Sequence, residues 1–497
     1  MPSIISQLEH LENSQDIVLR DTAGGLSFQQ LHSVCSQLAN QLVNHGIRHL
    51  ALHADNGMEW VIADLACQMA DICILPLPTF FSIAQIKHAL RETPVDAIIS
   101  DNPALKSVVG EISHSEPLPD STHQQLLILR EKAGSALIPQ HTGKITYTSG
   151  STGTPKGVCL SNEQLLEQAA ILANAVALTR PRHLCLLPLS TLLENVAGVY
   201  TPLMAGGEVI VPTLRELGFC GSSSVNAATM TSVISRYQPT SLILTPQLLL
   251  LLVAAAAKGW QVPASLRFVA VGGSRVSPTL LSRAWQLGIP AYEGYGLSEC
   301  ASVVSLNTPH HHVPGSCGRP LPHLGVRFVD GEVIVTGNPM LGYVNDPESW
   351  GNQAIHTGDL GYLDTEGYLH INGRRKNLLI SSFGRNINPE WVESEFLSNP
   401  ALAELVVFGD ARPYCIALLT PRQKEMSDEQ IQKLVDDVNR RLPDYAQVRE
   451  WARLPAPLTT NPALITDNGR PRRNAIADHY AALVDSLYDA GVKELSA

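Results

Sequence analysis

Residues 146–158 read TYTSGSTGTPKGV and combine the groups that a bound polyphosphate needs. Three glycines let backbone N–H groups wrap closely, several hydroxyls add hydrogen bonds, and one lysine adds a positive charge. The P-loop of common NTPases requires Gly-Lys followed directly by Ser or Thr, whereas here Pro155 precedes Lys156 and Gly157 follows it. A β-prone run precedes the stretch, and an amphipathic helical pattern follows it, with Ser161 or Asn162 as N-cap. We predict a nucleotide-binding loop between a strand and a helix, and consider a flexible linker the weaker alternative.

Three later segments supply groups that complete a nucleotide site. AYEGYGLSEC (291–300) offers close backbone approach beside the aromatic face of Tyr295, and Glu299 could hold Mg²⁺. HTGDLGYLD contains Asp359, a carboxylate suited to a ribose diol, and GRRKNLLI contains Arg374, which could bind ribose or phosphate. Each group alone is compatible with a turn or a solvated charge. Their occurrence together, in this order after the loop, predicts an ATP site.

The elements that must position these residues follow an alternating pattern. In the first 300 residues, helix-like segments precede short apolar ones, as in FQQLHSVCSQLANQLVNHG then HLALHA, which is typical of doubly wound parallel sheets. From about Val326, VRFVDGEVIVTG and GYLDTEGYLHING predict hairpins. A new mixture of strands and helices follows Arg374. We predict an N-terminal domain at 1–375, with a β-rich subdomain at about 307–372, and a C-terminal α+β domain at 376–497.

Composition limits the function classes. The chain has 497 residues, 44% of them hydrophobic, and a net charge of −11, which disfavours binding to nucleic acid. The start lacks a basic and then apolar secretory pattern, and the apolar run at 248–257 is too short to cross a membrane. Nine scattered cysteines suit reduced thiols. We expect a cytoplasmic protein without a transmembrane segment that acts on small molecules.

At this point the motifs resemble those of the adenylate-forming (AMP-binding) superfamily, which contains acyl-CoA synthetases, peptide-synthetase adenylation domains and luciferases. The resemblance covers nearly the whole chain through YTSGSTGTPKGV, LPLSTLLENVAG, VGGSRVSPTLL, GYGLSE, GEVIVTGNPMLGY, TGDLGYLD and GRRKNLLISSFGRNINPEWVE. It implies a large N-terminal α/β domain of two doubly wound parallel sheets plus a small β-barrel. It also implies a small mobile C-terminal α+β domain that hinges near Lys376.

The resemblance further implies ATP, Mg²⁺ and CoA as ligands and a role for each motif residue. Thr152 and Glu299 are expected to hold Mg²⁺ and to take part in catalysis. The residues expected to bind ATP or AMP are Thr148, Ser149, Gly150, Ser151, Thr152, Gly153, Thr154, Lys156, Gly157, Gly272, Gly273, Ser274, Gly294, Tyr295, Gly296, Leu297, Ser298, Asp359 and Arg374. An acid is expected to attack the α-phosphorus of ATP, with release of pyrophosphate, and a thiol then to take the acyl group from the acyl-AMP.

The expected acid is a medium- or long-chain fatty acid, and the expected acceptor is CoA. LPLSTLLENV resembles the LPLSH-x-x-E segment of long-chain fatty acyl-CoA synthetases, with Thr191 in place of the usual histidine. The expected substrate pocket comprises Thr191, Glu194, Asn195 and Gly198. Around FVAVGG and PTSLILTP there is no acidic residue to bind the amine of an amino acid. The segment after the hinge carries no insertion like that of ligases that load acyl carrier proteins.

One departure concerns the lysine that the family uses during adenylation. The segment TDNGRPRRNAI, aligned on Gly469 and Arg473, carries Arg470 at the lysine position. Arginine keeps the charge but changes the reach and hydrogen-bond geometry. Two alternatives to a CoA ligase therefore stay open: a fatty acyl-AMP ligase that loads an acyl carrier protein, and a non-catalytic module that binds nucleotide or acyl-AMP.

Overall fold

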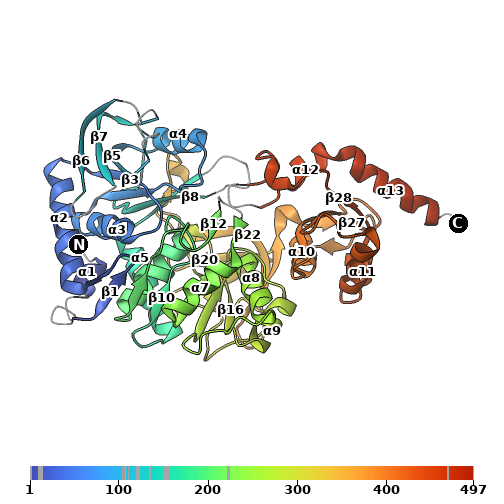
Figure 1. Ribbon diagram of the computed structural model, residues 1–497. Helices are drawn as coiled ribbons and strands as arrows, with labels where there is room; N and C mark the ends of the chain where they lie inside the picture. The colour runs from blue at the N-terminus through green and yellow to red at the C-terminus, as the bar shows by residue number, and fades with distance from the viewer. Residues whose placement is uncertain are drawn as a thin grey trace.

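The computed structural model describes residues 3–8, 15–102, 105, 108–109, 111–118, 124–133, 136–148, 156–220, 224–466 and 470–495 (Figure 1). Its larger part is built on two mixed sheets of nine and eight strands, each with a parallel centre and antiparallel edge strands. A four-stranded antiparallel sheet and a C-terminal α+β unit follow along the chain. The predicted α/β class with a separate small α+β domain is confirmed.

Most strands of the nine-stranded sheet come from residues 182–320. Its central strands β10, β14, β15 and β16 run parallel, so their carboxyl ends meet at one edge. From edge to edge its strands are β18 (Arg319–Pro320), β17 (Ser305–Leu306), β16 (Ala291–Tyr295), β15 (Phe268–Val271), β14 (Ser241–Leu244), β10 (Arg182–Leu184), β11 (Glu208–Ile210), β1 (Ile17–Arg20) and β2 (Gly25–Ser27).

The eight-stranded sheet carries the two strands that enclose the predicted phosphate loop. From edge to edge its strands are β21 (Gly342–Tyr343), β9 (Lys156–Leu160), β8 (Lys144–Thr148), β4 (Cys73–Pro76), β3 (His49–His53), β5 (Val95–Ser100), β7 (Gln125–Ala133) and β6 (Ile112–Pro117). Strands β8 and β9 are antiparallel, with Thr148 opposite Lys156. The loop therefore joins two strands, and helix α5 (Asn162–Val176) begins only after β9. The predicted helix and its Ser161 N-cap are confirmed. The strand β9 between the loop and this helix was not predicted, although Val158, Cys159 and Leu160 are buried on both faces of the sheet.

Helices cover both sheets and also fill the space between them. The central layer contains α2 (Phe28–Asn44), α3 (Met58–Ala70) and α5, whose buried residues share one core with both sheets. Helices α7 (Ala227–Tyr237), α8 (Pro246–Ala257) and α9 (Pro278–Gln286) cover the outer face of the nine-stranded sheet. Helix α4 (Ile83–Glu92) covers the outer face of the other. Strand β3 shows the alternation that this layering requires, since Leu50 and Leu52 face the central core and Ala51 faces α4.

The remaining short elements frame these layers. Helix α1 (Ile4–Gln7) packs near α3 and near α6 (Thr201–Met204), and the strands β12 (Phe219–Cys220) and β13 (Ser224–Val225) form a small hairpin. A seven-residue π-helix, η3 (Glu194–Tyr200), precedes α6 directly. Runs of π-helix are rare in proteins and are often found at functional sites.

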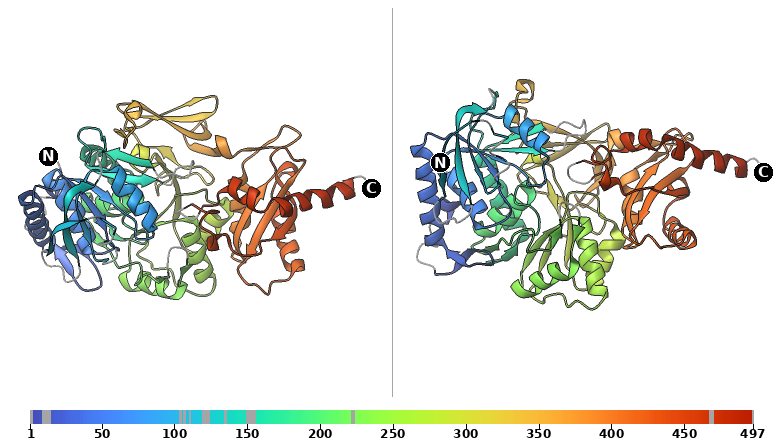
Figure 2. Two further views of the ribbon diagram at one scale, coloured as in Figure 1. Left: turned by 90° about the horizontal axis from the view of Figure 1, so that it is seen from above. Right: turned by 45° about the horizontal axis from the view of Figure 1, so that its top comes forward.

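The β-rich unit is a four-stranded antiparallel sheet in the order β19 (Gly325–Val329), β20 (Glu332–Thr336), β22 (Ala354–Leu363) and β23 (Leu369–Arg374). Where the sequence predicts a small β-barrel, this order leaves β19 and β23 as edge strands of an open sheet. The β19–β20 hairpin turns at Asp330 and Gly331, which both have positive φ, as predicted from the Asp-Gly pair. The sheet stands out from the top of the molecule in the left view of Figure 2.

The C-terminal unit has its own core and lies at one end of the molecule in both figures. Its three-stranded sheet has the order β26 (Leu402–Phe408), β27 (Cys415–Pro421) and β28 (Val448–Arg453). Helices α10 (Pro389–Leu397) and α11 (Asp428–Asn439) pack on one face, and α12 (Arg473–His479) and α13 (Ala481–Leu495) on the other. The hairpin of β24 (Leu379–Ile380) and β25 (Asn386–Ile387) precedes α10. In the part of the chain that the structure describes, no helix is both long and apolar enough to cross a membrane.

Candidate active site

At the Lys156 end of the predicted phosphate loop, Tyr343 lies between two predicted site residues, Lys156 and Glu299. Lys156 begins β9, and its ammonium lies 4.7 Å from the centre of the Tyr343 ring. The Tyr343 hydroxyl donates a hydrogen bond of 2.9 Å to Glu299, which belongs to a short 3₁₀ helix, η4 (Ser298–Cys300). Burial, together with the neighbouring Glu299 carboxylate, raises the pKa of Tyr343, so the hydroxyl keeps its proton and remains a donor. Tyr343 thus connects the predicted phosphate-binding lysine to the predicted magnesium ligand.

Six of the predicted loop residues cannot be placed. Ser149, Gly150, Ser151, Thr152, Gly153 and Thr154 lie outside the described residues, and for Thr148 only the backbone of β8 is described. Glu299 is partly exposed beside the loop ends, and a carboxylate in such a position fits the oxygen ligands that Mg²⁺ prefers.

A second cluster joins the residues that are predicted to bind ribose. Asp359 and Arg374 are directly opposite each other in the antiparallel pair of β22 and β23, and an ion pair of 3.0 Å joins them. The Tyr295 hydroxyl, at the end of β16, donates a 2.6 Å hydrogen bond to the other carboxylate oxygen of Asp359. Burial raises the pKa of Asp359, while Arg374 and the Tyr295 hydroxyl act against that rise. The sheet register and the end of β16 therefore bring these three side chains together.

The glycine-rich turns predicted to frame adenine lie at the carboxyl ends of β15 and β16. Gly272 and Gly273 follow β15, while Gly294 and Tyr295 end β16 and Gly296 follows. A Cβ atom on Gly296 would lie 1.7 Å from the carbonyl oxygen of Ser302, so only glycine fits there. Ser274 follows Gly273 in the same turn. Ligands of open α/β sheets commonly bind at such carboxyl ends.

Arg470, from the C-terminal unit, reaches this same region. Its guanidinium donates a hydrogen bond to the carbonyl oxygen of Gly273. Its backbone is held by a bridge from Ile465 to Pro471 and by hydrogen bonds to Thr466. Lys376, the predicted hinge, is exposed in the short 3₁₀ helix η6 (Arg375–Asn377) between β23 and β24. The structure therefore brings Arg470, but not Lys376, to the carboxyl end of β15.

A cavity of about 220 Å³ opens beside these turns and runs into the layer between α5 and the nine-stranded sheet. Gly272, Gly273, Tyr295 and Gly296 line one end of it. Its walls are mostly apolar, and the other lining residues include Leu297 and Ser298 as well as Leu172, Val176, Leu178, Pro181, His183, Thr191, Ala197, Ala205, Ser241, Ile243, Phe268 and Ala270. Among the lining residues that the structure describes there is no lysine and no arginine.

The four predicted substrate-pocket residues take different positions around this cavity. Thr191 lines it and is exposed, whereas the other three residues do not line it. Glu194 is fully buried behind the wall and lies 3.1 Å from Nε2 of His183, whose Nδ1 lies 3.0 Å from the hydroxyl of Ser241. Gly198 packs against the same pair, because a Cβ atom there would lie 2.5 Å from the Glu194 carboxylate.

Asn195, the fourth of these residues, belongs to a buried polar cluster on the opposite side of η3. Lys144 of β8 donates to Asp64 of α3 over 2.7 Å, to the Tyr200 hydroxyl over 2.8 Å, and to the side-chain oxygen of Asn195. Asp64 accepts two further hydrogen bonds, of 2.5 Å from Tyr200 and 2.8 Å from Asn195. The cluster therefore ties the strand that leads into the phosphate loop to the π-helix beside the cavity.

Comparison with the sequence profiles of known families identifies the family of this chain. The sequence profile of AMP-binding enzymes matches residues 10–344, and that of the AMP-binding enzyme C-terminal domain matches residues 376–491. The chain belongs to the AMP-binding enzyme family. The predicted membership of the adenylate-forming superfamily is therefore confirmed.

Curated relatives of this AMP-binding enzyme are named for an aromatic acid. A 2-succinylbenzoate–CoA ligase of Bacillus cereus (strain Q1) is 28% identical over 440 residues, which cover 82% of this chain and 85% of the relative. The ligase of the same name from Bacillus subtilis (strain 168) is 28% identical over 411 residues, covering 77% and 80%. The motifs pointed instead to long-chain fatty acyl-CoA synthetases, so the acid is considered below as a proposal.

Solved structures share the fold. The anthranilate CoA ligase AuaEII in complex with anthranoyl-AMP has a TM-score of 0.80 at 19% identity, with 98% of both chains covered. O-succinylbenzoate coenzyme A synthetase from Bacillus subtilis, in complex with ATP and magnesium ion, has a TM-score of 0.75 at 24% identity, with 95% and 99% covered. Together with the family membership, these relatives confirm the predicted enzyme class, an AMP-forming acid–CoA ligase.

Sequence reasoning did not single out several side chains of this AMP-binding enzyme. Tyr343 is the last residue of the motif GEVIVTGNPMLGY, so its motif was identified but its contact with Lys156 and Glu299 was not. His183 and Ser241 stand in ordinary strand segments without a recognisable motif. No sequence signal marked His183 and Ser241, because their contact depends on the parallel pairing of β10 with β14.

Proposed function

We propose that this enzyme activates a monocarboxylic acid with an elongated, uncharged and mostly apolar tail, such as a medium- or long-chain fatty acid, and transfers the acyl group to CoA. The observation that carries the proposal is the apolar cavity that opens beside Gly272, Gly273 and Tyr295. A nucleotide held at these turns and an acid held in this cavity would meet where the cavity opens.

The proposed roles at the nucleotide come from the family motifs, and the contacts of the described residues support several of them. Lys156 and the loop at 149–155 bind the phosphates, Asp359 and Arg374 bind the ribose, and Glu299 with Thr152 holds Mg²⁺. When bound, Mg²⁺ neutralises charge on the phosphate oxygens. Tyr343 holds the Glu299 carboxylate in place through its hydrogen bond of 2.9 Å. The ion pair between Asp359 and Arg374 supports the ribose role, because Arg374 opposes the rise that burial causes in the pKa of Asp359 and so favours the carboxylate form, which accepts from hydroxyls.

Arg470 is proposed to steer the acid carboxylate to the α-phosphate. An oxygen of the carboxylate attacks the α-phosphorus, the bond to the bridging oxygen breaks, and pyrophosphate leaves. The thiolate of CoA then attacks the acyl carbon, and AMP leaves. Positioning and charge neutralisation supply most of the catalysis in such transfers. The hydrogen bond from Arg470 to Gly273 supports this role, because it brings the cation to the turn beside the cavity.

The lining of the cavity favours an uncharged tail. A second carboxylate, such as 2-succinylbenzoate carries, would be buried in a cavity whose described lining has no lysine or arginine. His183 is already occupied on both ring nitrogens by Ser241 and Glu194. Burial of an unpaired carboxylate costs several kcal/mol. We therefore expect a dicarboxylic aromatic acid to bind poorly.

The shape of the cavity favours an elongated tail. Lining residues occur along β15 from Phe268 to Val271, a stretch of roughly 10 Å at about 3.3 Å per residue. An aromatic monocarboxylic acid is the second candidate, because a solved structure of similar fold is named as an anthranilate CoA ligase. Phe268 and Tyr295 line the cavity and could pack against an aromatic ring.

Exchange of pyrophosphate into ATP tests the proposal directly. The acids would be hexanoate, octanoate, dodecanoate, hexadecanoate, benzoate, anthranilate and 2-succinylbenzoate at equal concentrations. We expect the strongest stimulation from fatty acids and the weakest from 2-succinylbenzoate. Stimulation by 2-succinylbenzoate alone would contradict the proposed acid class. ATP binding without stimulation by any acid would favour the non-catalytic module instead.

A variant within the cavity makes the assignment of the acid site sharper. Ala205 lines the cavity, so Ala205→Leu should shift the preference toward shorter acids without a change in the KM for ATP. Ala256→Leu on α8 is the matched control, because Ala256 does not belong to the lining. An unchanged preference in Ala205→Leu would mean that the acid binds elsewhere.

The acceptor is tested separately from the acid. Preformed acyl-AMP would be presented to the enzyme with CoA or with an acyl carrier protein, and the consumption of acyl-AMP measured. Faster consumption with CoA supports the proposal, and faster consumption with the carrier protein supports the alternative ligase.

A further inference from the structure

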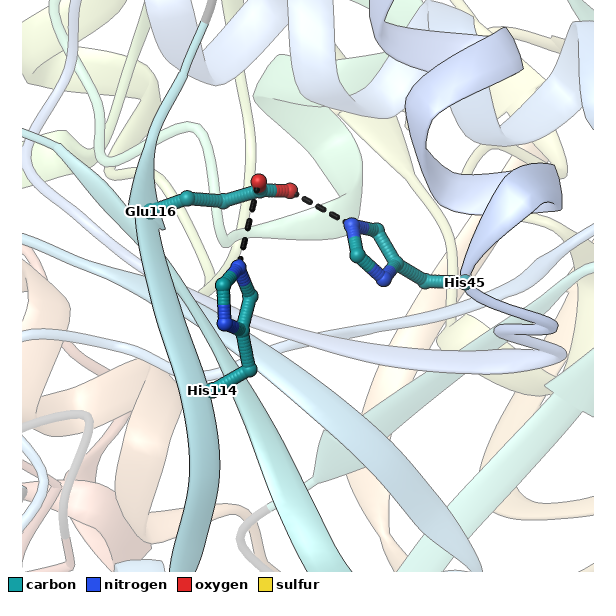
Figure 3. Close-up of side chains that lie close together, drawn as sticks. All are labelled: His45, His114 and Glu116. Atoms are coloured by element: carbon teal, nitrogen blue, oxygen red, sulfur yellow. Dashed lines mark hydrogen bonds and ion pairs between the residues drawn. The ribbon is translucent and has the colours of Figure 1, made fainter.

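Two histidines and a glutamate, none of them predicted to bind nucleotide, lie close together at the surface (Figure 3). His45 follows the last residue of α2, while His114 and Glu116 are two residues apart on β6 and so share one face of that strand. Nε2 of His45 lies 2.7 Å from one oxygen of Glu116, and Nε2 of His114 lies 3.3 Å from the other. Figure 3 shows the ring of His45 pointing toward this carboxylate from the end of α2, and the ring of His114 pointing toward it from the same strand as Glu116.

These three side chains have the composition and spacing of a transition-metal site. Zn²⁺ takes imidazole nitrogen at about 2.0 Å and carboxylate oxygen at about 2.0 to 2.2 Å in tetrahedral sites. Ligand atoms around such an ion are therefore about 3.3 Å apart. In the cluster, one potential ligand atom from each residue lies within 4.8 Å of the others. Small side-chain rotations would thus be enough to bring all three onto one ion.

The carboxylate is prepared for this role by its neighbours. Gln41, one turn earlier on α2, donates a hydrogen bond of 2.7 Å to Glu116. Polar partners of this kind commonly orient a metal ligand from behind. His45 and His114 are exposed, so water can reach a fourth position.

A second cluster of potential metal-binding residues lies in the protein interior. His183, Cys185 and Glu194 also lie within metal-binding reach of one another, but all three are buried. Burial and the Glu194 carboxylate raise the pKa of Cys185, so its sulfur stays a thiol rather than the thiolate that binds metals. Its sulfur instead lies 3.7 Å from the carbonyl oxygen of Gly198. This cluster is therefore part of the cavity wall.

We propose that His45, His114 and Glu116 form a surface site for a divalent transition-metal ion of the Zn²⁺ type, with water as a fourth ligand. Strand β6 is an edge strand of the eight-stranded sheet. The metal ion ties this edge strand to the end of α2, and so to the central helical layer. Edge strands are otherwise exposed to pairing with other chains, and such a connection holds the edge in place.

The test measures zinc binding by the full-length protein, freed of metal by dialysis against a chelator and kept without nucleotide. Of the nine free cysteines, Cys220 is the exposed one, so the protein would carry Cys220→Ser to remove a competing thiol. Zn²⁺ would be titrated in competition with a chromophoric chelator. We expect one equivalent to bind, and His114→Gln or Glu116→Gln to weaken that binding by at least about tenfold.

His356→Gln is the matched control. His356 is exposed and lies 3.8 Å from Glu332, so it also pairs with a glutamate, but no third ligand from the described part of the chain joins that pair. The control should keep the wild-type affinity for Zn²⁺. Circular dichroism would verify that all variants are folded, as expected for changes at exposed positions. Equal zinc affinity in wild type and His114→Gln, or equal losses in His114→Gln and His356→Gln, would overturn the proposal.

Discussion

Replacement of Lys144 by methionine should destabilise the N-terminal region strongly. The side chains of Lys144 and Asp64 are each only 1% exposed, and their ion pair measures 2.7 Å. Methionine is close to lysine in length and fills most of its space, so the main change is the loss of the ammonium group. Asp64 then remains as a buried carboxylate without a cation. Removal of one partner of such a pair typically costs about 3 to 5 kcal/mol.

The remaining contacts place the expected cost near the lower limit of that range. Asp64 keeps the hydrogen bonds from Tyr200 and Asn195, of 2.5 and 2.8 Å, which continue to stabilise its charge. We therefore expect a loss of about 3 kcal/mol. With an entropy of unfolding of about 2.1 cal/mol/K per residue, over about 375 residues, this loss lowers the Tm by about 4 °C.

Scanning calorimetry is the suitable assay, because a chain of this size does not unfold in one step and the N-terminal transition has to be followed separately. Lys87→Met, an exposed position on α4, is the control and should leave the Tm within about 1 °C. The double variant Asp64→Asn, Lys144→Met should regain most of the loss, because no buried charge remains. A Tm of Lys144→Met equal to wild type, or no recovery in the double variant, would refute this account of the cluster.

Three further predictions concern the nucleotide side. Gly296→Ala should reduce pyrophosphate exchange about 100-fold, since its Cβ would lie 1.7 Å from the Ser302 carbonyl oxygen, whereas Gly24→Ala, with open space around it, should not. Burial raises the pKa of Glu293 from 4.5 to about 7, so the stability from its neutral form is complete below about pH 4.5 and lost as the pH rises through 7. Glu293→Gln should therefore gain roughly 2 to 3 kcal/mol over wild type between pH 5 and pH 8 in thermal melts, and a constant difference would contradict this. Arg470→Lys should slow exchange about tenfold, because lysine lacks the fork that reaches Gly273, and faster exchange would instead mark the arginine as a handicap.

The sequence singled out Asp359 and Arg374 as ribose-binding candidates through their motifs, but it did not predict that they pair with each other. The Glu-Gly turn at 366–367 predicts the hairpin, whereas Asp359 lies opposite Arg374 only because a register shift between Leu360 and Gly361 moves the pairing by one residue. The layered fold was predictable, since helix and strand periodicities alternate along the first 300 residues. The hairpin and the layers depend on residues that are close in the sequence.

Features that depend on distant residues were not predictable. Lys144 has the sequence context of an ordinary strand lysine, and Asp64 that of a polar helix position. Only the packing of β8 against α3 and η3 shows that both are buried and need each other. Asn195 illustrates the same limit, because its motif suggested the substrate pocket while its side chain faces Lys144. The short strand that begins at Lys156 was not predicted for a related reason, since its strand character comes from pairing with β8.

The alignment that assigns Arg470 gains support from a contact that the alignment did not use. Arg473, the other anchor of that alignment, forms a buried pair with Glu393 of α10, with nitrogen–oxygen distances of 2.6 and 3.2 Å. It also donates to the carbonyl oxygen of Val407 over 2.5 Å. A shift of the segment by one residue would leave this carboxylate without its cation, at a cost of several kcal/mol. The register is therefore determined inside the C-terminal unit, and Arg470 reaches Gly273 as a consequence of it.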